Sequence, residues 1–152
     1  MKKHQNLFRD LQEDFRKMKK NLLVAQSGGP TAAINATLAG VIKQAIKEEQ
    51  IDQVYGACYG IQGVLEQKFV NLTEKVDTEE KLEKLKRTPA AALGSCRFKL
   101  NDIKEDDSQY QEIVDILHKM NIGYFVYIGG NDSMDTVAKL SAYCKEKGVE
   151  DI

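Results

Sequence analysis

Apolar residues follow two spacings in this chain, and the two spacings alternate along it. Short apolar runs of strand length occur at LLVA (22–25), QVYGACY (53–59) and YFVYI (124–128). Apolar residues at helical spacing occur over 34–46, 106–120 and 133–147, and a short charged helix is indicated over 79–87. Because strands that alternate with helices are typical of βαβ units, the pattern predicts an α/β fold with a mostly parallel sheet and flanking helices.

Turn residues indicate where these elements end. The helix that begins near Asp106 is expected to stop at Gly123, and YFVYI is then expected to be a buried strand. Two glycines in GIQG (60–63) predict a turn at which the backbone closely approaches another segment. The last helix is expected to run from about Ser133 to Lys147. Its inward-facing side chains are predicted to be Met134, Val137, Ala138, Leu140 and Cys144.

The first twenty residues form a separate predicted element. Apolar side chains recur at helical spacing over residues 5–19, with charges between them, so this segment indicates a short amphipathic helix. Its apolar stripe either packs on another subunit or, as we favour, covers its own domain or belongs to an upstream extension. We therefore divide the chain into an N-terminal helical extension (1–20) and an α/β segment (21–152).

Composition excludes several classes of function. The 22 Lys and Arg residues nearly balance the 23 Asp and Glu residues, so neither nucleic acid nor a membrane is the expected partner, and any anion site must be local. No apolar run approaches the roughly 18 residues of a membrane-spanning helix, and no signal-peptide core is present, so we expect a cytoplasmic protein. Three widely spaced cysteines indicate reduced thiols, and two histidines leave little for a histidine-rich metal site or a Ser/His/Asp triad.

Two glycine-rich loops each follow a predicted strand and precede a predicted helix. These are SGGP (27–30) and GGND (129–132). In a parallel sheet such loops line the ligand crevice, and glycine lets a phosphate approach the amide groups of the following helix. Taken singly, each loop is explained equally well as a tight turn, and neither GxxxxGK[ST] nor GxGxxG occurs. The two loops together suggest a polyphosphate ligand.

Two charged residues extend this hypothesis. Arg97 offers a planar fork of donors suited to phosphate oxygens, although a surface salt bridge would also explain it. Asp132 is suited to Mg²⁺, which prefers carboxylate, water and phosphate oxygens, or alternatively to capping the last helix.

Four motifs in this order, QSGGPTAAINA, GIQGVL, TPAAALGSCRF and YIGGNDSMD, resemble the N-terminal part of the phosphofructokinases, from Asn21 to about Gly148. The resemblance implies glycolytic transfer of a phosphoryl group to the 1-hydroxyl of fructose 6-phosphate, with Mg²⁺ as cofactor. It implies that Arg97 contacts the transferring group, and it places the metal site at Asn131 and Asp132, with Asp132 also in a catalytic role. The metal-binding aspartate of the ATP-dependent branch falls at Asn131, and an amide oxygen binds Mg²⁺ more weakly than a carboxylate does. Either Asp132 takes over the metal, or the ion is held mainly by the pyrophosphate itself. The donor-phosphate contacts that the resemblance implies are Gly28, Gly29, Arg97, Gly129, Gly130 and Ser133.

The phosphoryl donor is the point at which this sequence departs from the ATP-dependent branch, whose second loop reads GGDGS. A carboxylate at Asp132 resembles the pyrophosphate-dependent branch, as does SGGP followed by Thr31 in place of SGGDAPG. The carboxylate would repel the α-phosphate of ATP, because two like charges about 4 Å apart cost about 4 kcal/mol at an effective dielectric constant of about 20. We therefore favour pyrophosphate as donor and keep ATP as the alternative.

The family's catalytic base is an aspartate in a TIDND motif, which is absent from this sequence. The chain resembles roughly the first third of an enzyme that we expect to be a homo-oligomer, and we expect the chain alone to be inactive. A non-catalytic phosphate-binding fragment is therefore a second hypothesis. The related lipid and nicotinamide dinucleotide kinases, with a GGDGT loop, are a weaker third because they lack the LGSCRF motif.

Overall fold

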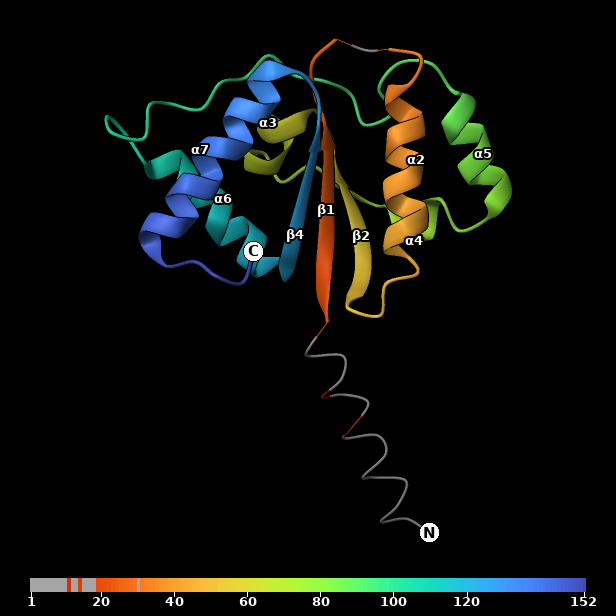
Figure 1. The fold of residues 1–152 in the computed structure, drawn as a ribbon, viewed down its shortest axis with the longest axis horizontal. Coiled ribbons are helices and arrows are strands. Elements are labelled where there is room, and N and C mark those ends of the chain that lie inside the picture. The colour runs from red at the N-terminus through yellow and green to blue at the C-terminus, as the bar shows by residue number, and fades with distance from the viewer. Residues whose placement is uncertain (1–10, 12–13, 15–18, 30) are drawn as a thin grey trace.

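The computed structural model describes residues 11, 14, 19–29 and 31–152. Most of the predicted helix over 5–19 lies outside these residues, so the N-terminal extension remains a prediction. The described chain forms one four-stranded sheet in the order β3-β2-β1-β4, with helices on both of its faces (Figure 1). The strands are β1 (Lys20–Gln26), β2 (Ile51–Ala57), β3 (Phe69–Asn71) and β4 (Ile122–Ile128).

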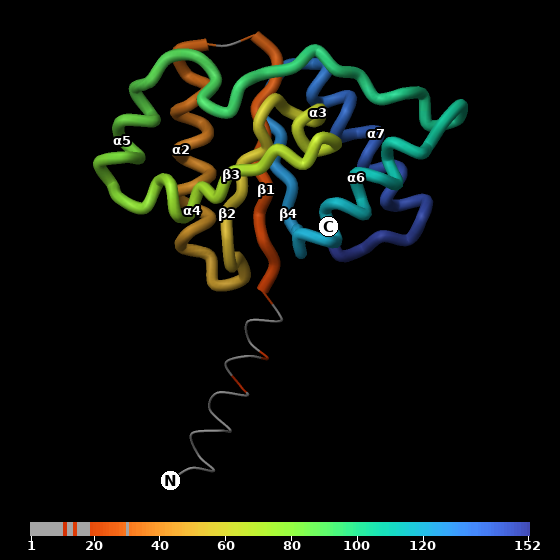
Figure 2. The backbone as a smooth tube through the Cα atoms, turned by 180° about the vertical axis from the view of Figure 1, so that it is seen from behind, coloured from red at the N-terminus to blue at the C-terminus, as the bar shows by residue number. Residues whose placement is uncertain are grey.

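The helices divide between the two faces of the sheet. In Figures 1 and 2, α2 and α5 cover one face, and α3, α6 and α7 cover the other. The helices are α2 (Ile34–Ala45), α3 (Gly60–Leu65), α4 (Leu72–Lys75), α5 (Glu79–Arg87), α6 (Ser108–Lys119) and α7 (Asn131–Lys147). Of these elements, β3 and α4 were not predicted, because three or four residues are too few to show a period.

The central strand β1 supplies side chains to both cores. Leu23 and Ala25 pack with α3, α6 and α7, whereas Leu22 and Val24 pack with α2 and α5. A side chain such as Leu23, which is fully buried, stabilises the fold by about 2 kcal/mol through removal of apolar surface from water. Burial on both faces explains why LLVA is continuously apolar.

The strand pairing confirms the predicted mostly parallel sheet. β1 pairs in parallel with both β2 and β4, and only the short β3 runs antiparallel, beside β2. The carboxyl ends of β1, β2 and β4 therefore lie at one edge of the sheet, where the two glycine-rich loops leave it.

Three details around β4 and α3 differ from the predictions. α6 ends at Lys119 and not at the predicted stop, Gly123. The residue with a positive φ after this helix is Asn121, at 52°. Gly123 instead lies inside β4, where a Cβ would come 2.6 Å from the Cβ of Lys20. GIQG begins helix α3 and is not a simple turn. β4 is an edge strand of the described sheet rather than a buried one, and Tyr124 is 38% exposed.

The inward face of α7 also differs from the prediction. Met134 is 48% exposed and Ala138 faces solvent, whereas Leu140 and Cys144 are buried as expected and Val137 is half-buried. Ser133, Thr136 and Tyr143 take the inward positions that were missed. Hydrophobicity alone misassigned this face because small polar residues occupy its first turns, beside the loops.

None of the helices in the described part of the chain has the length and apolar character of a membrane-spanning segment.

The close backbone approach predicted for GIQG is confirmed at Gly63, where a Cβ would overlap the carbonyl oxygen of Cys58. We expect Gly63→Ala to lower the free energy of unfolding by about 3 kcal/mol, because relief of the overlap requires a backbone shift. Gly40→Ala is the matched control, since a Cβ on this exposed position of α2 meets nothing within 4 Å. It should raise stability by about 0.5–1 kcal/mol. Urea denaturation of both variants checks the pair, and equal stabilities would contradict the packing at Gly63.

Candidate functional site

A cleft lies at the carboxyl edge of the parallel strands, between three segments that are distant in sequence. They are the loop after β1, the long connection over 88–107 between α5 and α6, and the loop after β4 with the start of α7. Figure 2 shows the connection crossing from one side of the molecule to the other above the strand ends. The predicted site residues that line the cleft are Gly28, Gly29, Arg97, Gly130, Asn131, Asp132 and Ser133. Gly129 is the only predicted site residue that does not line it.

The four loop glycines fall into two pairs, because the fold itself requires glycine at only two of the positions. Gly28 has a φ of +81°, and a Cβ there would come 3.2 Å from the amide nitrogen of Gly130. A Cβ on Gly129 would overlap the Ser133 hydroxyl. The fold itself therefore requires glycine at these two positions. Gly29 and Gly130 have no positive φ, and a Cβ on either would meet nothing within 4 Å. The described fold gives no reason for glycine at these two positions, which border open space in the cleft.

The first turn of α7 presents unpaired polar groups to the cleft. Gly130 is the N-cap, and no side chain caps this end of the helix. The first amide groups of a helix have no intrahelical acceptor, so this end attracts anions. The Ser133 side chain is only 2% exposed, and its hydroxyl has no hydrogen-bond partner within the described protein. A buried polar group of this kind is costly unless something binds it.

Asp132 does not cap α7, contrary to one of its two predicted roles. A capping residue must precede the helix, whereas Asp132 lies within its first turn. Its carboxylate instead forms an ion pair with Lys99, whose Nζ lies 3.3 Å from Asp132 Oδ1. Both side chains are largely exposed, at 77% and 74%.

The segment that carries Arg97 is held in place by two buried amide side chains. Gln26, at the end of β1, accepts a hydrogen bond from Leu93 N at 2.9 Å and donates one to Asn35 Oδ1 at 3.1 Å. Asn35, on α2, accepts from Ala92 N and donates to the carbonyl of Thr88, both at 2.9 Å. Both amides are fully buried, so they connect the first strand and helix to the 88–93 segment without help from water.

Two serine hydroxyls attach the same connection to the loop after β1, at Ser95 and Cys96. Ser27 Oγ donates to the carbonyl of Cys96 at 3.1 Å, and Ser95 Oγ donates to the carbonyl of Gly28 at 2.7 Å. The loop after β1 and the LGSCRF segment therefore form one hydrogen-bonded unit. Arg97 makes no ion pair with any residue that the structure describes, so the salt-bridge explanation of this arginine has no support there.

The charges in the cleft favour an anionic ligand. Its charged lining residues, within the described chain, are Arg97, Lys99 and Asp132, which leaves one net positive charge in a chain whose formal net charge is −1. Burial raises the pKa of Tyr127, which accepts a hydrogen bond from Ile61 N at 3.0 Å and stays neutral. Burial opposes ionisation of the Cys96 thiol, yet hydrogen bonds from the backbone at Phe98 and Gln62 leave its pKa below the ordinary value.

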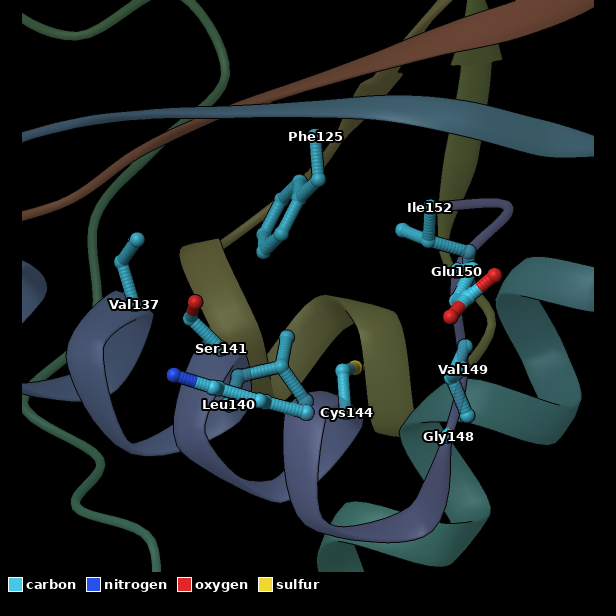
Figure 3. Close-up of a pocket in the computed structure, with 10 residues that line it drawn as sticks. Phe125, Val137, Leu140, Ser141, Cys144, Gly148, Val149, Glu150 and Ile152 are labelled. Atoms are coloured by element: carbon cyan, nitrogen blue, oxygen red, sulfur yellow. The ribbon is translucent and has the colours of Figure 1, made fainter.

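A second hollow lies between β4 and α7 and has different chemistry. Figure 3 shows Phe125, Leu140, Cys144 and Ile152 around it. Its lining is mostly apolar, and no pair of glycine loops converges there. It is therefore a poorer candidate for a phosphate than the cleft at the strand ends.

Among the residues of this site that sequence reasoning missed are Gln26, Asn35 and Lys99. The first two carried a usable signal, because an amide at the end of an apolar strand and another on the apolar face of a helix must find buried partners. Lys99 carried no signal beyond its place two residues after Arg97.

The sequence pattern of the phosphofructokinase family matches residues 21–149, which include all three segments of the cleft. The chain belongs to the phosphofructokinase family. Its resemblance to that family, first indicated by four short motifs, is thereby confirmed over residues 21–149.

Two relatives of the chain within this family are pyrophosphate-dependent by name. The chain is 44% identical over 123 residues to the pyrophosphate–fructose 6-phosphate 1-phosphotransferase of Rhodospirillum rubrum. That match covers 81% of this chain and 29% of the relative, so the chain spans less than a third of that protein's length. The crystal structure of a pyrophosphate-dependent phosphofructokinase from Nitrosospira multiformis superposes with a TM-score of 0.78 at 37% identity, over 88% of this chain and 32% of that one.

The identity is lower to an ATP-dependent relative. The ATP-dependent 6-phosphofructokinase 3 of Bacteroides thetaiotaomicron is 32% identical over 122 residues, which are 78% of this chain and 34% of that protein. The phosphofructokinase fold, with its mostly parallel sheet, is confirmed by these likenesses.

The Gln26 network generates a prediction about the phosphofructokinase cleft. We expect Gln26→Met, which keeps the length of the side chain, to cost about 2–3 kcal/mol, because it leaves the buried N–H of Leu93 without an acceptor and removes one of the two donors to Asn35 Oδ1. Gln44→Met is the control, since Gln44 is exposed near the end of α2 and donates to the exposed side chain of Glu48. Hydrogen exchange should accelerate at the amides of Ala92 and Leu93 in the first variant only. Unchanged exchange at both amides would show that Gln26 does not hold this segment.

Proposed function

We propose that this chain is the donor-phosphate-binding segment of a pyrophosphate-dependent phosphofructokinase, with residues 21–152 forming that segment. The observation that carries the proposal is the convergence of Gly29, Gly130 and the unpartnered Ser133 hydroxyl on one cleft with a net positive charge. Bare backbone, a helix N-terminus and a buried hydroxyl are together suited to phosphate oxygens. The names of the relatives at 37–44% identity support pyrophosphate as donor.

In this proposal each part of the cleft has a distinct task. The amides of Gly28 and Gly29 and of the GGNDS loop, from Gly129 to Ser133, bind the donor phosphates. Arg97, exposed and without an ion pair in the described chain, contacts the phosphoryl group that moves to the 1-hydroxyl of fructose 6-phosphate. The bridging P–O bond breaks and orthophosphate leaves. Catalysis of this transfer depends mainly on alignment and on stabilisation of charge.

The residues of the cleft fit Mg²⁺ when the phosphates of the donor supply further ligands. The oxygens of Asp132 and Asn131 are ligands of the kind that Mg²⁺ prefers, and both side chains are accessible. No group of three or more His, Cys, Asp or Glu side chains that could hold a metal occurs among the described residues. Mg²⁺ often binds through one or two carboxylates together with substrate phosphates, and it would neutralise charge on the donor oxygens. We therefore assign Asp132, assisted by Asn131, to that ion.

A second candidate function is pyrophosphate binding without turnover by this chain alone. The observation that favours it is that Asp132 is the sole carboxylate lining the described cleft, and it is paired with Lys99. A proton acceptor for the sugar hydroxyl would have to come from elsewhere. Phosphoryl transfer, a homo-oligomeric assembly and a cytoplasmic location are thus proposed for a longer protein of this family. For this chain we expect donor binding and no measurable transfer.

The first test uses Gly29, one of the two loop glycines that the described fold does not itself require. We expect Gly29→Ala to weaken Mg²⁺–pyrophosphate binding about tenfold, or about 1.4 kcal/mol, while stability stays within about 0.5 kcal/mol. A Cβ at Gly29 would meet no protein atom within 4 Å, and we assign this open space to the phosphate. Isothermal titration calorimetry of the wild type, this variant and Gly40→Ala measures the effect. The proposal fails if the wild type does not bind pyrophosphate, or if Gly29→Ala binds it as tightly as the wild type does.

The second test concerns the choice of donor. We expect the wild type to bind Mg²⁺–pyrophosphate in preference to Mg²⁺–ATP, and Asp132→Gly to bind metal-free ATP at least about tenfold more tightly than the wild type does. The physical reason is removal of the like charge opposite the α-phosphate. Asp135→Gly, an exposed change on the same helix, is the control for a nonspecific effect of charge. Equal affinity of the wild type and Asp132→Gly for metal-free ATP would remove the assigned role of this carboxylate.

A further inference from the structure

Lys99 lies at the mouth of the cleft, and its role is not explained by packing. Its Nζ is 3.3 Å from Asp132 Oδ1, so the ion pair joins the Arg97 segment to the first turn of α7. The Lys99 side chain is 74% exposed and that of Asp132 is 77% exposed. Ion pairs this exposed add little to stability, because water screens them and ordering two long side chains costs entropy. The effect of the pair is therefore on the charge of the cleft.

The pair neutralises a carboxylate at the place where an anion is expected to bind. Asp132 lies in the same helical turn as the amides and the Ser133 hydroxyl to which we assign a phosphate. An uncompensated carboxylate there would repel that phosphate. Lys99 removes this repulsion while the pair is intact. A lysine ammonium is a compact charge on a flexible stem with three donors, so it can change partners at little cost.

We propose that Lys99 is an exchangeable counter-ion of the donor site. In the empty site it pairs with Asp132, and when the donor binds it moves to a phosphate oxygen and leaves the Asp132 carboxylate to Mg²⁺. The inference rests on the proposed function, and it adds a binding role for Lys99 and an order of events at Asp132. Two positive groups, Lys99 and Arg97, then contact the donor, while the metal compensates the one carboxylate.

Calorimetric titration of Mg²⁺–pyrophosphate at constant ionic strength tests the role of Lys99. We expect Lys99→Met to weaken binding about tenfold, the loss of roughly one charge-assisted contact, or about 1.4 kcal/mol. Lys99→Arg keeps the positive charge and should stay within about threefold of the wild type. Lys104→Met is the matched control, because Lys104 is an exposed lysine on the same connection and does not line the cleft. This control should stay within about twofold of the wild type.

Metal-free pyrophosphate tests the exchange itself. Asp132→Asn removes the repulsion and releases Lys99, so this variant should bind metal-free pyrophosphate more tightly than the wild type and the Mg²⁺ complex more weakly. In the Asp132→Asn background, Lys99→Met should cost more metal-free affinity than in the wild type, because the lysine no longer has to leave a partner. Damage to the fold would weaken binding of both forms of the donor, so the opposite signs separate exchange from damage.

The outcomes distinguish this inference from the proposal on which it rests. If the wild type binds no pyrophosphate, the proposed function and this inference both fail. If the wild type binds and Lys99→Met binds equally well, or loses no more than Lys104→Met, only the inference fails. If Asp132→Asn unfolds at the same temperature as the wild type and yet weakens metal-free and Mg²⁺-bound pyrophosphate alike, Lys99 is not exchanged between Asp132 and the donor.

Discussion

The parallel pairing of β1 with both β2 and β4 is the constraint on which the rest of the structure depends. It places the carboxyl ends of three strands at one edge of the sheet, so that the SGGP and GGND loops meet although about a hundred residues separate them. The pairing in turn depends on β1 being apolar on both faces, with Leu23 and Ala25 on one core and Leu22 and Val24 on the other. An antiparallel arrangement of β1 and β4 would place these loops at opposite edges.

Within this frame, polar side chains do the fine positioning. Gln26 and Asn35 are fully buried and bind the 88–93 segment, and Ser27 and Ser95 continue that attachment to the residue before Arg97. These side chains are uncharged, and they bind backbone groups that would otherwise lack partners. Among the described residues, the Ser133 hydroxyl is the one buried side-chain polar atom without a hydrogen-bond partner, and it lies where the ligand is expected.

The sequence alone was sufficient for the features that depend on periodicity and on local glycine patterns. It predicted the α/β class, the helices near α2, α5, α6 and α7, and the grouping of Arg97 with both glycine loops, all of which the structure shows. It failed where tertiary contacts determine which residues are buried and why a glycine is needed. Gly123 looked like a helix stop but is needed for packing against Lys20, and Met134 looked buried but is exposed because the inward positions near the loops are polar. The ion pair between Lys99 and Asp132 depends on where two distant segments meet, which no local pattern records.

The central claim is that the three segments around the cleft form one binding site for pyrophosphate. The most direct measurement is a titration of Mg²⁺–pyrophosphate into the isotopically labelled chain, followed through its backbone amide resonances by NMR. The account predicts that the amides of Gly28, Gly29, Arg97 and the turn from Gly130 to Ser133 shift together with one Kd. The amides of Phe125 and Leu140, beside the apolar hollow, should not shift. Saturable shifts at the apolar hollow, or shifts that omit Gly29 and Ser133, would contradict it.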